Sequence, residues 1–161
     1  MAQLKSRLFK TADEAAVDAL RGALPKSMRE KHEYGGFIYR IGSPPKFFYC
    51  TPLVKTSQPK GGSLTTPAKP PGATLVAQMH THPFDEDFYG EDGVLSTIVK
   101  PPRFSDVDVK GRDDFEKALS QGPINMYVID IHREVSVLER KPGSSTATER
   151  QVRPADDLTG I

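Results

Sequence analysis

The residues whose types and spacing most directly suggest chemistry are two histidines, His80 and His82, at the end of an apolar stretch. On a β-strand, residues i and i+2 project from one face, and the residue between them, here Thr81, projects from the other. The two imidazoles can therefore bind one metal ion side by side. Pro83 ends the strand directly behind them and leaves that end open. The alternative is a pair of structural histidines in a core.

A catalytic zinc ion takes three ligands from the protein and keeps a further position for water. The chain has a single cysteine, Cys50, which excludes disulfides and thiolate zinc sites within one chain. The third ligand should then be a carboxylate. Asp108 is a candidate, because Ser105 and Asp108 are three residues apart and share one face of a helix. The same pair also fits a helix capping box, and the two interpretations are compatible.

Glu33 is a candidate general base, since water activated by a metal ion needs an acceptor for its proton. It stands at the start of a predicted strand, just before Gly35 and Gly36. Two glycines inside a strand indicate a bulge or a close approach by another backbone. The alternative for Glu33 is an ordinary solvated side chain.

The order of Glu33, then His80-Thr81-His82-Pro83, then Ser105-Asp106-Val107-Asp108 resembles the JAMM (MPN-plus) signature of JAB-domain zinc metalloproteases. The preceding helix rich in Asp, Glu and Ala, and the segment Glu-Tyr-Gly-Gly-Phe-Ile-Tyr that begins at Glu33, are more similar still to bacterial JAB-like domains. Those domains are found at the ends of polymorphic toxins and secreted effectors. The resemblance extends from Thr11 to Leu138.

This resemblance implies an α/β (α+β) domain of the JAB/MPN-like, cytidine-deaminase-like fold, with a curved, mostly antiparallel sheet flanked by helices. It implies zinc (Zn2+) held by His80, His82 and Asp108, with Glu33 as general base. Ser105 would donate a hydrogen bond to the carbonyl oxygen as it becomes an oxyanion. The implied reaction is hydrolysis of a peptide or isopeptide bond. The expected partners are a peptide or protein substrate and, for a toxin or effector domain, a cognate immunity protein or a delivery polypeptide.

The sequence departs from the family pattern in a long insertion, residues 83–104, between the histidines and Ser105. Its acidic and aromatic residues suit a cationic side chain such as lysine, through charge and cation–π contact. The residues expected to bind substrate are Phe84, Asp85, Glu86, Phe88 and Tyr89. A loop of this length is a lid, a substrate clamp or an autoinhibitory plug, or else a solvated loop.

Hydrophobic patterning predicts the elements that carry these residues. A capping box at Thr11 and apolar residues at helical spacing predict a helix over Ala12–Leu24, which Pro25 should end. Strands are expected at 33–41, 47–54, 73–80, 124–131 and 134–138, and a second helix at 105–119. In the first strand, Phe37 and Tyr39 should share one face and Ile38 the other. We expect one domain over residues 1–140 and a flexible tail over 141–161, which is rich in Pro, Ser, Thr, Gly and charge.

Composition and charge exclude other classes of function. The formal net charge of +1 argues against nucleic acid or an anionic membrane as a partner. No apolar run approaches the roughly 20 residues that cross a bilayer. The first residues also lack the apolar stretch of a secretory signal. We therefore expect a cytoplasmic protein, or one delivered outside the cell by a specialised secretion system.

Two alternatives remain open at the level of sequence. A JAB-like domain can be a binding module without catalysis. A cupin-type metal enzyme would use His80, His82 and Glu86, with His132 as a fourth ligand. Against the cupin, Thr74 stands where its motif has a glycine, and two helices fit poorly in an all-β barrel.

Overall fold

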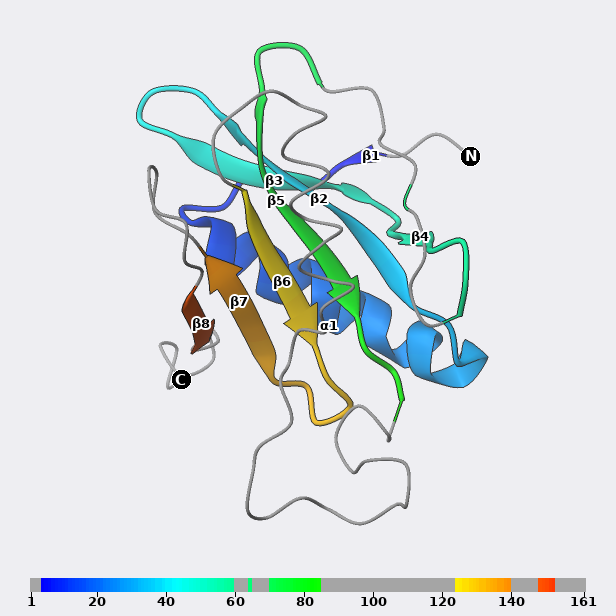
Figure 1. Ribbon diagram of the computed structural model, residues 1–161. Coiled ribbons are helices and arrows are strands. Elements are labelled where there is room, and N and C mark those ends of the chain that lie inside the picture. The colour runs from blue at the N-terminus through cyan, green and yellow to red at the C-terminus, as the bar shows by residue number, and fades with distance from the viewer. Residues whose placement is uncertain (1–3, 60–63, 65–69, 85–123, 140–147, 153–161) are drawn as a thin grey trace.

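The computed structural model describes residues 4–59, 64, 70–84, 124–139 and 148–152 (Figure 1). Within these ranges one helix packs on an open, mixed sheet of eight strands in the order β1-β3-β2-β5-β6-β7-β8, with β4 paired to β2. The elements are β1 (Leu4–Lys5), α1 (Ala12–Glu30), β2 (Tyr34–Ile41), β3 (Lys46–Thr51), β4 (Val54–Lys55), β5 (Thr74–Thr81), β6 (Asn125–Ile129), β7 (Val135–Glu139) and β8 (Thr148–Gln151). The α+β class predicted from the sequence is confirmed at this coarse level. In this part of the chain, no helix is both long enough and apolar enough to cross a membrane.

The pairing of the strands determines which chain segments meet at each end of the sheet. All neighbouring pairs are antiparallel except β5 and β6, which run parallel. The end of β5 therefore lies between the end of β6 and the start of β2, where Gly35 pairs with His80. Parallel neighbours need a crossover connection of a dozen or more residues, and residues 82–124 provide that length.

The main hydrophobic core lies between α1 and one face of the sheet (Figure 1). The Thr11 side chain accepts a hydrogen bond from the Glu14 backbone N–H at 3.1 Å, as the predicted capping box requires. The core residues include Ala16, Leu20, Leu24, Ile38, Met79, Tyr127, Ile129 and Val137. A smaller cluster on the other face contains Phe37, Tyr39, Phe48 and Leu75. The predicted division of the β2 side chains between two faces is therefore confirmed.

The prediction that α1 ends at Leu24 is wrong, because the helix continues through Pro25 to Glu30. A proline inside a helix removes one backbone hydrogen bond and costs about 3 kcal/mol relative to alanine. Tertiary packing offsets this cost: Leu24 and Ser27 are buried on either side of Pro25, and the Ser27 hydroxyl bonds to β5. The helix ends at Glu30, and the C-cap residue Lys31 adopts the left-handed conformation.

The expected flexible tail over 141–161 is wrong for residues 148–152. Thr148–Gln151 forms β8, an edge strand antiparallel to β7, and Val152 is buried in the main core. Arg150 anchors this strand through ion pairs with Glu139 at 2.7 Å and Asp13 at 2.9 Å. The composition is misleading here because the side chains of β8 stay exposed, and the strand is held by backbone pairing with β7 and by the ion pairs of Arg150. The predicted helix over 105–119 lies outside the described residues.

Candidate metal centre

Three predicted site residues lie together where β2 begins and β5 ends. One ligand atom from each of Glu33, His80 and His82 lies within 4.8 Å of the other two. The Nε2 atoms of the two histidines are 2.8 Å apart. Glu33 and His80 are 7% and 6% exposed, and His82 is half-buried. The cluster is thus largely shielded from solvent, at the edge of the sheet where β2 begins and β5 ends.

Strand β5 and its neighbours orient the two histidines. Met79 lies in the core beneath α1, and Thr81 bonds to α1, so both project toward the helix. His80 therefore projects from the opposite face, between Gly35 of β2 and Val128 of β6. The backbone N–H of His82 donates to the Ile129 carbonyl at 2.8 Å, which extends the ladder one residue beyond β5. The alternation expected from the sequence is kept at the site.

Gly35 lies directly opposite His80, where a side chain would not fit. A Cβ atom there would lie 2.8 Å from the Met79 carbonyl oxygen and 2.6 Å from the side chain of Leu64. The predicted close approach of another backbone is therefore present. The break in the β2–β5 register falls elsewhere, between Ile38 and Tyr39. The missing side chain lets β2 and β5 meet closely beside the histidine.

A short segment after β4, residues 56–59, holds Glu33 by its backbone. The Glu33 N–H donates to the Pro59 carbonyl at 2.9 Å, and the Glu33 carbonyl accepts from the Thr56 N–H at 3.1 Å. His32 Nε2 lies 2.8 Å from the Thr56 carbonyl oxygen. Residues 56–59 therefore fix the chain on both sides of Glu33. Nothing in the sequence Thr56-Ser57-Gln58-Pro59 indicates that role.

Asp130 is a further acidic residue at this edge of the sheet, and the sequence did not single it out. Tyr127 and Ile129 face α1, so Asp130 shares the face of Val128 and follows the residue that pairs with Thr81. It is 6% exposed. Its Oδ1 accepts hydrogen bonds from the N–H groups of His132 at 2.8 Å and Glu134 at 3.1 Å. Its carboxylate thus holds the β6–β7 turn next to the histidine pair.

The remaining predicted residues divide into two groups. His132 is exposed in the β6–β7 turn and is not one of the clustered ligands among the described residues, so the fourth ligand of the cupin alternative is not at the site. Phe84, two residues after His82, lies within the described residues and is half-buried. The other predicted residues lie outside the described residues: Asp85, Glu86, Phe88, Tyr89, Ser105 and Asp108.

The geometry of the cluster fits a divalent metal ion. Two nitrogen ligands about 2.0–2.1 Å from a tetrahedral zinc ion would be about 3.3 Å apart. The Nε2 atoms of His80 and His82, at 2.8 Å, need only a small opening to reach that separation. A buried carboxylate such as Glu33 is costly unless positive charge or strong donors compensate it. Two imidazoles with a carboxylate suit zinc, and also iron(II) and other first-row divalent ions.

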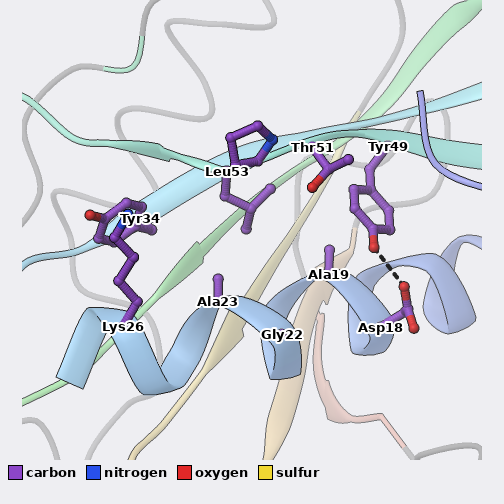
Figure 2. A pocket seen from close by; sticks show the side chains of 10 residues that line it. Asp18, Ala19, Gly22, Ala23, Lys26, Tyr34, Tyr49, Thr51 and Leu53 are labelled. Atoms are coloured by element: carbon purple, nitrogen blue, oxygen red, sulfur yellow. Dashed lines mark hydrogen bonds between the residues drawn. The ribbon is translucent and has the colours of Figure 1, made fainter. Parts of the chain in front are cut away.

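A separate hollow of about 240 Å³ lies between α1 and the sheet (Figure 2). It is on the face opposite to the one from which His80 projects. Its walls include Gly22 and Lys26 of α1 and Tyr34, Tyr49 and Leu53 of the sheet. The Tyr49 hydroxyl donates to Asp18 at 2.6 Å across one end. Burial, together with a hydrogen bond to Glu30, raises the pKa of Tyr34 to about 12. These tyrosines therefore stay neutral at physiological pH and act as donors.

Neither a scan against protein-family models nor a search of curated proteins finds a match for this chain. Chemically, two imidazoles beside a carboxylate can hold a metal ion and accept a proton from water next to it.

Proposed function

We propose that this chain is a zinc-dependent hydrolase of the JAMM type that cleaves a peptide or isopeptide bond. The observation that carries the proposal is the cluster of Glu33 with His80 and His82, whose ligand atoms lie within 4.8 Å of one another. In the JAMM signature, these same positions are the acid/base glutamate and the two metal-binding histidines. The order of residues in the sequence and their proximity in space thus support the same assignment.

We extend the proposal to the fold, which we assign to the JAB/MPN-like type. Its support is the position of the site at the C-terminal end of β5, between an antiparallel and a parallel neighbour. Crossover connections between parallel strands usually contain a helix, and the proposed helix with Ser105 and Asp108 belongs to that connection. We also propose a role as a toxin or effector domain, and the sequence resemblance supports this role.

Each residue has a defined task in the proposed reaction. His80, His82 and Asp108 would hold the ion. Zinc, when bound, supplies Lewis-acid chemistry that makes water a stronger acid and polarises a carbonyl group. Glu33 takes one proton from the attacking water and passes it to the leaving amine nitrogen as the C–N bond breaks. Ser105 donates a hydrogen bond to the substrate carbonyl oxygen as negative charge develops there.

Elemental analysis and zinc titration test this proposal. They are applied to the purified chain and to four variants: Asp108→Ala, Glu33→Gln, Glu86→Ala and His132→Ala. We expect one zinc ion per chain in the parent protein and a large loss of affinity in Asp108→Ala. Glu33→Gln should keep the zinc and lose hydrolysis of lysine isopeptides or peptides in a quenched-fluorescence library. His132→Ala is the matched control and should keep both properties.

Each other outcome identifies a specific alternative. Loss of zinc in Glu33→Gln with retention in Asp108→Ala would make Glu33 a ligand and not the base. Loss of zinc in Glu86→Ala, with Asp108→Ala unaffected, would favour the cupin type of site. A parent protein that binds zinc and cleaves none of the library would favour the binding module. Absence of zinc binding in the parent protein would overturn the proposal.

A further inference from the structure

A buried hydrogen-bond chain lies beneath the histidine pair, on the α1 side of the sheet. The Tyr34 backbone N–H donates to Thr81 Oγ1 at 2.9 Å, and Thr81 Oγ1 lies 2.6 Å from Ser27 Oγ. The Ser27 hydroxyl donates to the His32 carbonyl at 2.7 Å. Because this bond uses the only hydroxyl proton of Ser27, the Thr81 hydroxyl must donate to Ser27. The chain therefore runs in one direction, from Tyr34 through Thr81 and Ser27 to His32.

This chain joins the two parts of the candidate metal centre. Thr81 is the residue between His80 and His82, and Tyr34 and His32 are the two neighbours of Glu33. The register between β2 and β5 ends at Gly35 and His80, so Glu33 lies beyond the backbone ladder. The Thr81 side chain continues the connection past that end. Ser27, in the part of α1 that follows Pro25, also bonds to Thr81 and so ties the helix to this connection.

The environment explains why a threonine suits this position. Ser27 and Thr81 are both 0% exposed, and a buried backbone N–H such as that of Tyr34 needs an acceptor. A β-branched side chain in a strand has a restricted χ1 angle, which fixes the direction of the hydroxyl. Valine has nearly the same shape but cannot accept from Tyr34 or donate to Ser27. Serine keeps the hydroxyl and loses only a methyl group.

We propose that Thr81 is a positioning residue, whose hydroxyl fixes the segment that carries Glu33 against the strand that carries His80 and His82. Ser27 holds Thr81 in place from α1. The inference rests on the proposed function, because it concerns the geometry of that same metal centre. It assigns a role to a side chain that points away from the metal.

Zinc affinity and the visible absorption of the cobalt(II)-loaded protein test this inference, with thermal unfolding measured in parallel. We expect Thr81→Val to bind zinc about tenfold more weakly, because Thr81 lies between the ligands His80 and His82 and its hydrogen bonds fix the end of the strand that orients both. Its cobalt spectrum should also change, because that spectrum reports coordination geometry. Thr81→Ser should restore both properties to near the parent values. Val137→Ala, a core change on β7, is the control for general destabilisation and should leave zinc affinity unchanged.

The outcomes separate this inference from the proposed function. If the parent protein binds zinc and Thr81→Val matches it in affinity and cobalt spectrum, the positioning role is wrong and the proposed function stands. If the parent binds neither metal, both are wrong. If Thr81→Val does not fold, Ser27→Ala carries the test, because it removes the anchor of the Thr81 hydroxyl. Weaker zinc binding in Ser27→Ala supports the inference, and unchanged binding overturns it.

Discussion

The Nε2 atoms of His80 and His82 face each other at 2.8 Å at the end of β5. At this distance the two rings form one hydrogen bond, in which one ring nitrogen donates and the other accepts. A metal ion would replace that hydrogen bond with two coordinate bonds. The carboxylate of Glu33, within 4.8 Å of both rings, would add the negative charge that favours a cation.

Zinc should stabilise this protein through the histidine pair. Zinc at about a hundred times its dissociation constant should raise the free energy of unfolding by about 2.7 kcal/mol. His80→Ala and His82→Ala should abolish this increase, whereas His132→Ala should retain it, because His132 lies exposed in a turn. Denaturant unfolding with zinc and with a chelator measures the effect. An equal response in all three variants would show that zinc binds elsewhere.

A methyl group at Gly35 should damage both the fold and the site. Its Cβ would lie 2.8 Å from the Met79 carbonyl oxygen, so Gly35→Ala must push β2 away from β5 beside His80. We expect a loss of about 1–3 kcal/mol in unfolding free energy, typical of overpacking, together with weaker zinc binding. Gly22→Ala is the matched control: its Cβ would meet nothing within 4 Å, and helix propensity should raise stability by about 1 kcal/mol. Similar effects of the two substitutions would contradict the close approach at Gly35.

Local sequence patterns predicted the elements that depend on local interactions. The cap at Thr11, the alternation of Phe37, Ile38 and Tyr39, and the histidine-bearing strand were all visible in this way. The proximity of Glu33 to the histidines was not, because β2 and β5 are brought together by pairing between distant segments. Only the order of residues in a known signature suggested it.

The features that the sequence did not reveal depend on tertiary contacts. The helix continues past Pro25 because Leu24 and Ser27 are buried against the sheet, which no propensity scale includes. Strand β8 has exposed side chains and is ordered by pairing with β7 and by Arg150. The role of Thr81 requires knowledge that Ser27 lies beneath it. Each case involves residues far apart in the chain.

Pro25 offers a direct test of the balance between local cost and tertiary packing in α1. Pro25→Ala restores a backbone N–H inside the helix, and the exposed position leaves room for the change. We expect an increase of about 2 kcal/mol in unfolding free energy. Alanine favours the helix over proline, but removing proline also gives the unfolded chain more conformational freedom, which offsets part of the gain. Pro70→Ala, in the loop before β5, is the control and should lower stability slightly. A loss of stability in Pro25→Ala would mean that the proline ring itself supports the last turns of α1.

The pH dependence of stability at high pH should report the buried hydroxyl of Tyr127. This hydroxyl donates to Asp13 Oδ1 at 2.5 Å, and the side chain is 1% exposed. Burial, and then the charge of Asp13, raise the pKa of Tyr127 far above its ordinary value. Because the neutral form is favoured in the folded state, the contribution is complete below the unfolded pKa of about 10 and is lost as the pH rises above it.

The expected signature is a difference between the parent protein and Tyr127→Phe that changes with pH. Below about pH 9 the parent should be more stable by about 1.5–3 kcal/mol, the value of a hydrogen bond to a charged group. Above about pH 10 this advantage should shrink by up to about 1.4 kcal/mol per pH unit, since the unfolded parent releases one more proton than the folded parent. Denaturant unfolding from pH 8 to pH 11 measures the difference. Leu75→Ala, a core change in the smaller cluster on the other face of the sheet, is the control, and its effect should not depend on pH. A constant difference across this range would mean that Tyr127 ionises in the folded protein as readily as in the unfolded chain.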